Sequence, residues 1–146
     1  MVMFAGGSHK SVGGEAKDSL ANVLETREFC VNIVSRELGE AMNVTSGHFP
    51  HGTDEFEQAG LAKGQSKAIK SPYVKDAPAV LECTLFKVIE LPGAQQMVIG
   101  EVVGIHIKDD YLVDGLLDVT RYQPLARLGY RDYSDVTDVF EVNRPK

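Results

Sequence analysis

The chain has 146 residues, of which 43% are hydrophobic and 25% are charged. This is the composition of an ordinary folded protein, and the length suits one domain, which we expect to span residues 1–146. The formal net charge of −6 disfavours a surface that neutralises the phosphates of a nucleic acid. The longest apolar runs are well below the ~20 residues of a membrane-spanning helix, and the N-terminus lacks a signal-peptide pattern. We therefore predict a cytoplasmic protein that binds neither nucleic acid nor membrane.

The first part of the chain is predicted to form short helices around one strand. Leu20, Val23 and Leu24 recur at helical spacing after a lead-in rich in glycine and serine, and a run rich in β-branched residues follows them. The expected elements are a helix over 18–28, a strand over 29–34, a helix over 36–44 with Ser35 as its N-cap, and a short helix over 54–59 for which Thr53 is the cap.

The second part of the chain carries the strongest strand signals. "AVLECTLFKVIEL" (79–91) and "QMVIGEVVGIHIKDD" (96–110) are separated by a short Pro-Gly turn, which predicts an antiparallel hairpin. We expect an irregular surface excursion over 63–78, a turn near Gly129 and a last strand over 136–142. Long antiparallel strands with a few short helices favour a mainly β fold, a β-barrel with flanking helices or an α+β domain, over a doubly wound sheet.

Two glycines and one histidine lie on the same predicted face of the second long strand. Gly100 and Gly104 alternate there with His106 at the end, and glycines in such a row allow another backbone or a flat ligand to approach closely. A histidine on a strand face is more often a hydrogen-bonded barrel residue than a catalytic one. We therefore predict a structural role for His106.

The cysteines and the loop histidines do not form a metal-binding pattern. Cys30 and Cys83 lie in separate apolar runs, so we expect two reduced, buried side chains without chemistry. His48 and His51 form an H-x-x-H pair beside acidic residues, but the pair lies in a loop and no third ligand has a defined spacing. A solvated or ligand-lining pair is favoured over a metal site.

The stretch "AGGSHKSVGGEAKDSLANV" (5–23) places a flexible loop with lysines and hydroxyls before the first predicted helix. The first N–H groups of a helix lack partners within the helix and carry partial positive charge. Lys17 adds a full charge and Ser19 a hydroxyl donor, so a phosphate is the natural occupant. The alternative is that Asp18 or Ser19 simply caps the helix, and spacing alone favours this alternative because no Walker-type pair is present.

Six segments in order carry a resemblance to a known family. They are "MVMFAGG", "KDSLANV", "EFCVNIVSRELGEAMN", "HGTDEFE", "MVIGEVVGIHI" and "YQPLARLGYRDY", and together they resemble the flavin reductase-like proteins of the FMN-binding split-barrel superfamily. The resemblance implies a small β-barrel flanked by helices and a homodimer. It also implies FMN, or possibly FAD, held at or near the dimer interface, NAD(P)H as cosubstrate and a possible partner oxygenase that receives reduced flavin.

The resemblance further implies which residues bind the cofactor. A segment at the start of the first helix matches the phosphate side of the family's site, the loop 48–56 matches a segment beside the flavin, and the "ARLGY" stretch matches a late motif near the cofactor. The cofactor-binding residues implied in this way are Ser8, Lys17, Asp18, Ser19, Asn22, His51, Arg127 and Tyr130.

The sequence departs from the family pattern in two places, and these differences lead to two functional hypotheses. Relatives usually begin several tens of residues before the counterpart of Met1, so we expect a split barrel shortened at its N-terminus. The Gly-Asp-His triplet of NAD(P)H:flavin reductases is replaced by Ala94, Gln95 and Gln96. The first hypothesis is an FMN-dependent oxidoreductase that transfers hydride from NAD(P)H to bound flavin. The alternative is a non-catalytic FMN-binding module.

Overall fold

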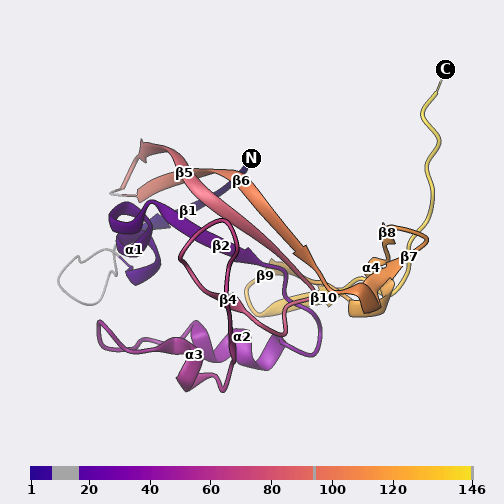
Figure 1. The fold of residues 1–146 in the computed structure, drawn as a ribbon, viewed down its shortest axis with the longest axis horizontal. Coiled ribbons are helices and arrows are strands. Elements are labelled where there is room, and N and C mark those ends of the chain that lie inside the picture. Colours follow the sequence, from indigo (N-terminus) through magenta and orange to yellow (C-terminus); the bar gives the residue numbers. More distant parts are fainter. Residues whose placement is uncertain (8–16, 94, 146) are drawn as a thin grey trace.

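Four antiparallel strands form the main sheet of the protein, whose computed structural model describes residues 1–7, 17–93 and 95–145. They lie in the order β1 (Val2–Gly7), β6 (Gln95–Ile107), β5 (Ala79–Leu91) and β2 (Glu28–Asn32). The long β5–β6 hairpin curls over α1 (Asp18–Thr26), as Figure 1 shows. This arrangement confirms the prediction of a mainly β fold with flanking helices.

The remaining elements are short and lie around this sheet. They are α2 (Gly39–Thr45), α3 (Glu55–Gln58), β3 (Lys63–Gly64), β4 (Tyr73–Val74), the 3-10 turn η1 (Asp109–Tyr111), β7 (Leu112–Val113), β8 (Leu116–Leu117), α4 (Val119–Tyr122), β9 (Leu125–Gly129) and β10 (Asp132–Asp135). β3 and β4 pair with each other within the segment that was expected to be irregular. In the described part of the chain, no helix is long and apolar enough to cross a membrane.

The predicted hairpin is confirmed, with two irregularities that bend it. β5 and β6 pair from Ala79 opposite Ile107 to Leu91 opposite Gln95, and the register shifts between Glu82 and Cys83 and again after Leu85. Such bulges add twist and let a long hairpin curl. The curl is what turns a four-stranded sheet into half of a barrel.

The helix caps differ from those predicted, while the helices themselves are present. α1 ends at Thr26 because Arg27 is left-handed (φ 63°) and returns its N–H to the Val23 carbonyl. α2 begins at Gly39, so Ser35 is not its N-cap; the Ser35 hydroxyl instead accepts from the Leu38 amide in the preceding turn, at 3.3 Å. The carboxylate of Asp54 caps α3 by accepting from Phe56, whereas the Thr53 hydroxyl donates to Pro50.

The predicted strand over 136–142 is wrong. The chain turns back after Gly129, as expected, but the returning strand is β10, which pairs with β9 and ends at Asp135. Beyond it the described residues 136–145 form no strand and leave the body of the protein (Figure 1). Val139, Phe140 and Val142 are exposed there. A strand needs a partner, and the β-branched and aromatic residues of this segment could not reveal that it has none among the described residues.

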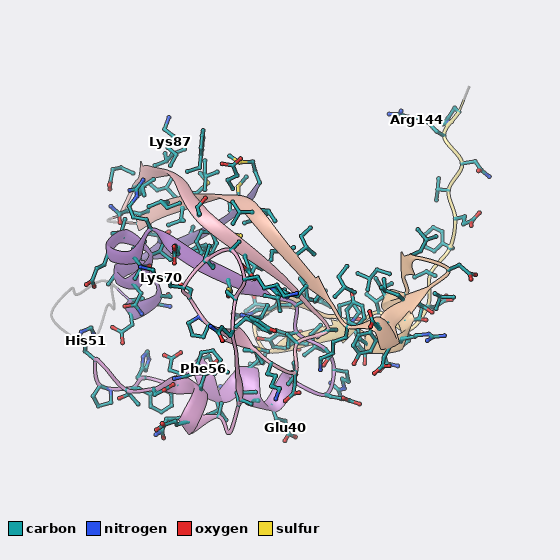
Figure 2. The ribbon with its side chains drawn as sticks, viewed as in Figure 1. Glu40, His51, Phe56, Lys70, Lys87 and Arg144 are labelled. Carbon is teal, nitrogen blue, oxygen red and sulfur yellow. The ribbon has the colours of Figure 1, made fainter. Side chains whose placement is uncertain are left out.

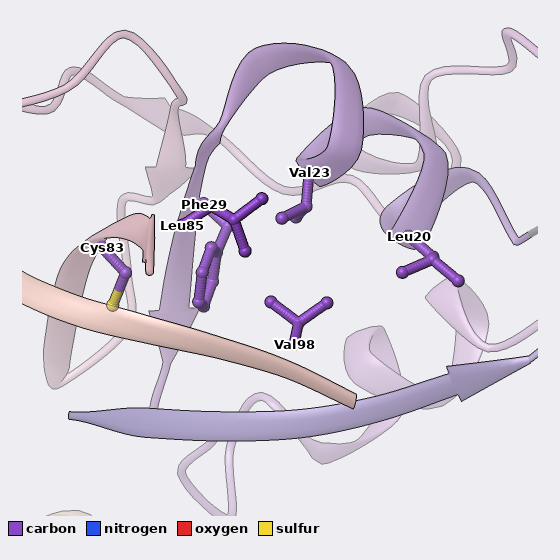
Figure 3. Packing of buried hydrophobic residues seen from close by; sticks show 6 residues of the cluster. All are labelled: Leu20, Val23, Phe29, Cys83, Leu85 and Val98. Carbon is purple, nitrogen blue, oxygen red and sulfur yellow. The ribbon is translucent and has the colours of Figure 1, made fainter. Parts of the chain in front are cut away.

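The core lies between α1 and the curled sheet. Figure 3 shows the buried side chains that form it, which are Leu20, Val23, Phe29, Cys83, Leu85 and Val98. The ring of Phe4 on β1 meets that of Phe29 edge to face, with 5.4 Å between the centroids. Burial of these residues fixes α1 against the sheet, and so fixes where the first turn of α1 lies.

The glycines of β6 were expected to let another backbone or a flat ligand approach closely. They instead make room for buried side chains of the same chain. A Cβ on Gly100 would lie 2.3 Å from the ring of Phe29, and one on Gly104 would lie 3.2 Å from the carboxyl carbon of Glu82. The two positions therefore serve internal packing.

Gly100→Ala is expected to lower the free energy of unfolding by about 1–3 kcal/mol, the usual cost of overpacking a core. The measurement is chemical denaturation followed by circular dichroism. Gly129→Ala is the matched control, because a Cβ at Gly129 meets nothing within 4 Å. Equal stability of the two variants would contradict the close packing of Phe29 on Gly100.

Both cysteines are free thiols, as predicted. Cys83 is fully buried in the core, and burial raises its pKa to about 11. Cys30 is half-buried, and its pKa is also raised, mainly by burial. A reactive cysteine needs a lowered pKa, so neither thiol is suited to nucleophilic chemistry.

Candidate functional site

A cavity of about 690 Å³ opens between the start of α1 and the loop that leads from α2 into α3. Figure 2 shows this region, with His51 beside the lower end of α1 and Phe56 on the α3 side. Five of the residues predicted to bind a cofactor line the cavity together, and these are Lys17, Asp18, Ser19, Asn22 and His51. Its volume lies within the range of cavities that hold small molecules and cofactors.

The first turn of α1 faces this cavity without a side-chain cap. Lys17 is the N-cap residue, with extended backbone (φ −60°, ψ 143°), and no side chain of the described residues caps the helix. The first bonds within the helix run from the amides of Leu20 and Ala21 to the Lys17 carbonyl, at 2.9 and 3.0 Å. The amides of Asp18 and Ser19 precede these bonds and have no partner within the helix. The alternative in which Asp18 or Ser19 caps the helix is therefore wrong.

An ion pair joins the loop to the helix at the edge of the cavity. The Nδ1 atom of His51 lies 2.7 Å from a carboxylate oxygen of Asp18. Both side chains are substantially exposed, and exposed pairs add little to stability, about 0–1 kcal/mol. The contact joins the loop to the first residue of α1.

A second ion pair lies on the opposite side of the cavity. The Lys63 ammonium contacts Asp54, the N-cap of α3, and stands 5.4 Å from the ring centroid of Phe56. The hydrogen bond from Lys63 is the main reason that the pKa of Asp54 is lowered. The pKa of Glu55 is raised, first by burial and then by the nearby charge of Asp18. The cavity thus carries charges of both signs, and its most anion-friendly part is the open start of α1 beside Lys17.

The other predicted residues lie elsewhere. Arg127 and Tyr130 belong to the β9–β10 hairpin, where the Arg127 guanidinium donates to the Tyr130 carbonyl at 3.1 Å. Tyr130 is 95% exposed, and neither residue lines the cavity of its own chain. Ser8 lies outside the described residues.

Sequence reasoning missed five residues of the cavity wall. Thr45, Ser46 and Gly47 directly precede the predicted loop, whereas Lys63 and Pro72 lie further along the chain. The last two are the less expected. Both come from the segment that was expected to be a surface excursion. They are brought to the cavity by the two-residue pairing of β3 with β4, which is too short to give a propensity signal. His48 lies beside His51 in the wall, and no group of acidic, histidine or cysteine residues suited to a metal occurs among the described residues.

A curled antiparallel sheet with an open helix start beside a cofactor-sized cavity defines a small ligand-binding barrel domain. Residues 1–126 match the sequence model of the flavin reductase like domain, and the chain belongs to this family. A protein of Aquifex aeolicus is 39% identical over 118 residues, which are 80% of this chain and 60% of the relative. One of Deinococcus radiodurans is 32% identical over 99% of this chain and 64% of its own length. The chain therefore spans less than two thirds of these relatives.

Solved structures show the same fold. Nitrilotriacetate monooxygenase component B from Bacillus cereus matches with a TM-score of 0.87 and 30% identity over 96% of this chain and 70% of its own. Flavoredoxin of Desulfovibrio vulgaris matches with a TM-score of 0.79 and 22% identity over 96% of this chain and 73% of its own. At 22% identity, the match to flavoredoxin supports only the similarity of fold. The split-barrel fold implied by the resemblance is confirmed.

Proposed function

We propose that the chain binds FMN in the cavity between α1 and the loop 45–56 and acts as a flavoprotein oxidoreductase that accepts hydride from NAD(P)H. The observation that supports this most is the first turn of α1, which no side chain in the described part of the chain caps. It has Lys17 as its N-cap residue and lies at the wall of a cavity large enough for a flavin. FMN ends in a phosphate, and free helix amides together with an ammonium suit that group. FAD is the other flavin that the fold family suggests.

The residues present fit such a cofactor. The amides of Asp18 and Ser19, the Ser19 hydroxyl and the Lys17 ammonium would hold the phosphate. Asn22 lies one turn further along α1, in the same wall. When bound, the flavin supplies the hydride chemistry itself, and the chain contributes binding, orientation and electrostatics.

We further propose that the protein is a homodimer that works in the cytoplasm and that residues 1–146 of each subunit form one domain. Arg127 and Tyr130 lie away from the cavity of their own chain, so a role for them at the flavin would have them reach the cavity of a second subunit. The similarity to nitrilotriacetate monooxygenase component B supports a partner oxygenase as the acceptor of reduced flavin.

The second candidate is a module that holds FMN without using NAD(P)H. It is favoured by Ala94, Gln95 and Gln96, which stand where NAD(P)H:flavin reductases carry Gly-Asp-His. The histidine associated with nicotinamide use is absent from that place. His106, near the other end of β6, contacts Glu82.

One experiment separates the two candidates and tests both. The purified protein, loaded with FMN and freed of excess by gel filtration, should retain the yellow absorbance of oxidised flavin. Under anaerobic conditions NADH or NADPH should then bleach this absorbance if the protein is an oxidoreductase. Retained colour without bleaching, while dithionite still bleaches it, would establish the module instead. Loss of all flavin on the column would contradict both.

A further inference from the structure

A fully buried carboxylate lies outside the cavity and has no part in the function proposed so far. Glu82 on β5 has no exposed surface. Its two oxygens accept hydrogen bonds from consecutive backbone amides, Lys67 at 2.8 Å and Ala68 at 2.6 Å, and the Nε2 atom of His106 contacts the first oxygen. A buried charge is costly unless it is paired and hydrogen-bonded. These donors therefore bind the segment 63–74 firmly to the sheet.

His106 extends this attachment to the other end of the segment. Its ring stacks on that of Tyr73 in β4, with 4.9 Å between the centroids and 26° between the planes. Tyr73 in turn covers Gly64 of β3, where a Cβ would lie 2.3 Å from the ring. Asn32 adds a second anchor by accepting from the Val74 amide at 2.8 Å. Glu82 and His106 thus hold the paired strands β3 and β4 against the sheet.

The same segment supplies the far wall of the cavity. Lys63 begins β3 and Pro72 directly precedes β4, and both line the cavity. Lys63 holds Asp54, which caps the helix that carries Phe56. A continuous series of contacts therefore runs from Glu82 through the segment to Lys63, and from Lys63 to the loop opposite α1.

We propose that Glu82, together with His106, is a positioning residue for the cavity: it seats the segment 63–74 so that Lys63 reaches Asp54 and completes the wall. This inference rests on the proposed function where it concerns flavin affinity, but its structural part stands without flavin. Glu82 itself does not line the cavity, so it acts only through the segment. A scaffold that locks the groups lining a site is what keeps such a site in its binding geometry.

The first test needs no cofactor. Because Lys63 is the main cause of the lowered pKa of Asp54, that pKa, followed by NMR, reports whether Lys63 is in place. In Glu82→Gln the pKa of Asp54 should rise toward the ordinary value of an aspartate. Tyr122→Ala is the matched control, because Tyr122 is buried in α4, outside the cavity wall. An unchanged Asp54 pKa in a folded Glu82→Gln variant would overturn the inference.

The second test is a double-mutant cycle on flavin affinity. Glu82→Gln should weaken FMN binding by about three- to tenfold in the native background and hardly at all in Lys63→Ala, because coupled residues are not additive. Equal weakening in both backgrounds would overturn the inference. If the native chain binds no FMN, the proposed function fails, and the Asp54 measurement still decides the positioning role. Should Glu82→Gln not fold, His106→Phe replaces it, since it keeps a ring beside Tyr73 and removes the donor to Glu82.

Discussion

Lys17→Glu is expected to weaken FMN binding by about one hundredfold. The change replaces an ammonium beside the open amides of α1 with a carboxylate that repels the phosphate. A hydrogen bond to a charged group contributes about 1.5–3 kcal/mol, and each 1.4 kcal/mol corresponds to a tenfold change in affinity. Loss of the bond and the added repulsion together bring the effect to the upper end of this range. The measurement is a fluorescence titration of the flavin-free protein with FMN at low salt, where screening is weak.

Two controls make this result specific for the phosphate. Lys87→Glu makes the same change of charge on β5, at the far side of the sheet from the cavity (Figure 2), and it should leave the affinity unchanged. Riboflavin carries the same ring system without a phosphate, so Lys17→Glu should hardly change its affinity. If Lys17→Glu and Lys87→Glu bound FMN equally well, or if riboflavin and FMN lost affinity alike, the phosphate would not lie at the start of α1.

The parts of the fold that sequence could predict are those set by local pattern. The β5–β6 hairpin follows from two long β-branched runs around a turn, where Gly93 takes up a φ of 76°. α1 follows from apolar residues at helical spacing that become core residues Leu20 and Val23. The segment 136–142 is also rich in β-branched and aromatic residues and forms no strand. The difference is a partner strand, which lies far away in the sequence when it exists at all.

The same distinction applies to the candidate site. Lys17, Asp18 and Ser19 are consecutive at the start of α1 and Asn22 follows one turn later, so a local pattern brings them together. Lys63 reaches the cavity only through long-range contacts, which involve a buried carboxylate on β5. A single glutamate in an apolar strand gives no sign of whether it is buried or which amides it binds. The place of Arg127 and Tyr130 in the site stays a prediction, because it depends on a second subunit.

Glu82→Gln is expected to lower the free energy of unfolding at pH 7 by about 2–4 kcal/mol. The buried carboxylate accepts from two backbone amides and contacts His106, and leaving a buried hydrogen-bonding group without its partner is strongly destabilising. The glutamine side chain keeps one acceptor oxygen, but it turns an amide donor toward one of the groups that now donate to Glu82. The measurement is urea denaturation followed by circular dichroism. Glu101→Gln is the matched control, because Glu101 is exposed on β6, and it should change the stability by less than about 0.5 kcal/mol.

At acidic pH, the difference in stability between the native chain and Glu82→Gln should disappear over a defined range. Burial by itself would raise the pKa of Glu82, but the bonds from His106 and from the amides of Lys67 and Ala68 outweigh it and lower the pKa from 4.5 to about 2. Because the folded pKa lies below the unfolded one, the carboxylate stabilises the fold fully above about 4.5, and this contribution is lost as the pH falls toward about 2. His106 is the titratable group in contact with Glu82, and the charge of Glu82 adds to burial in raising the pKa of Cys30. The thiol is neutral throughout this range because its pKa is raised. The stability gap between the native chain and Glu82→Gln should therefore narrow steadily from pH 5 to pH 2. A gap of constant size would mean that the fold does not lower the pKa of Glu82.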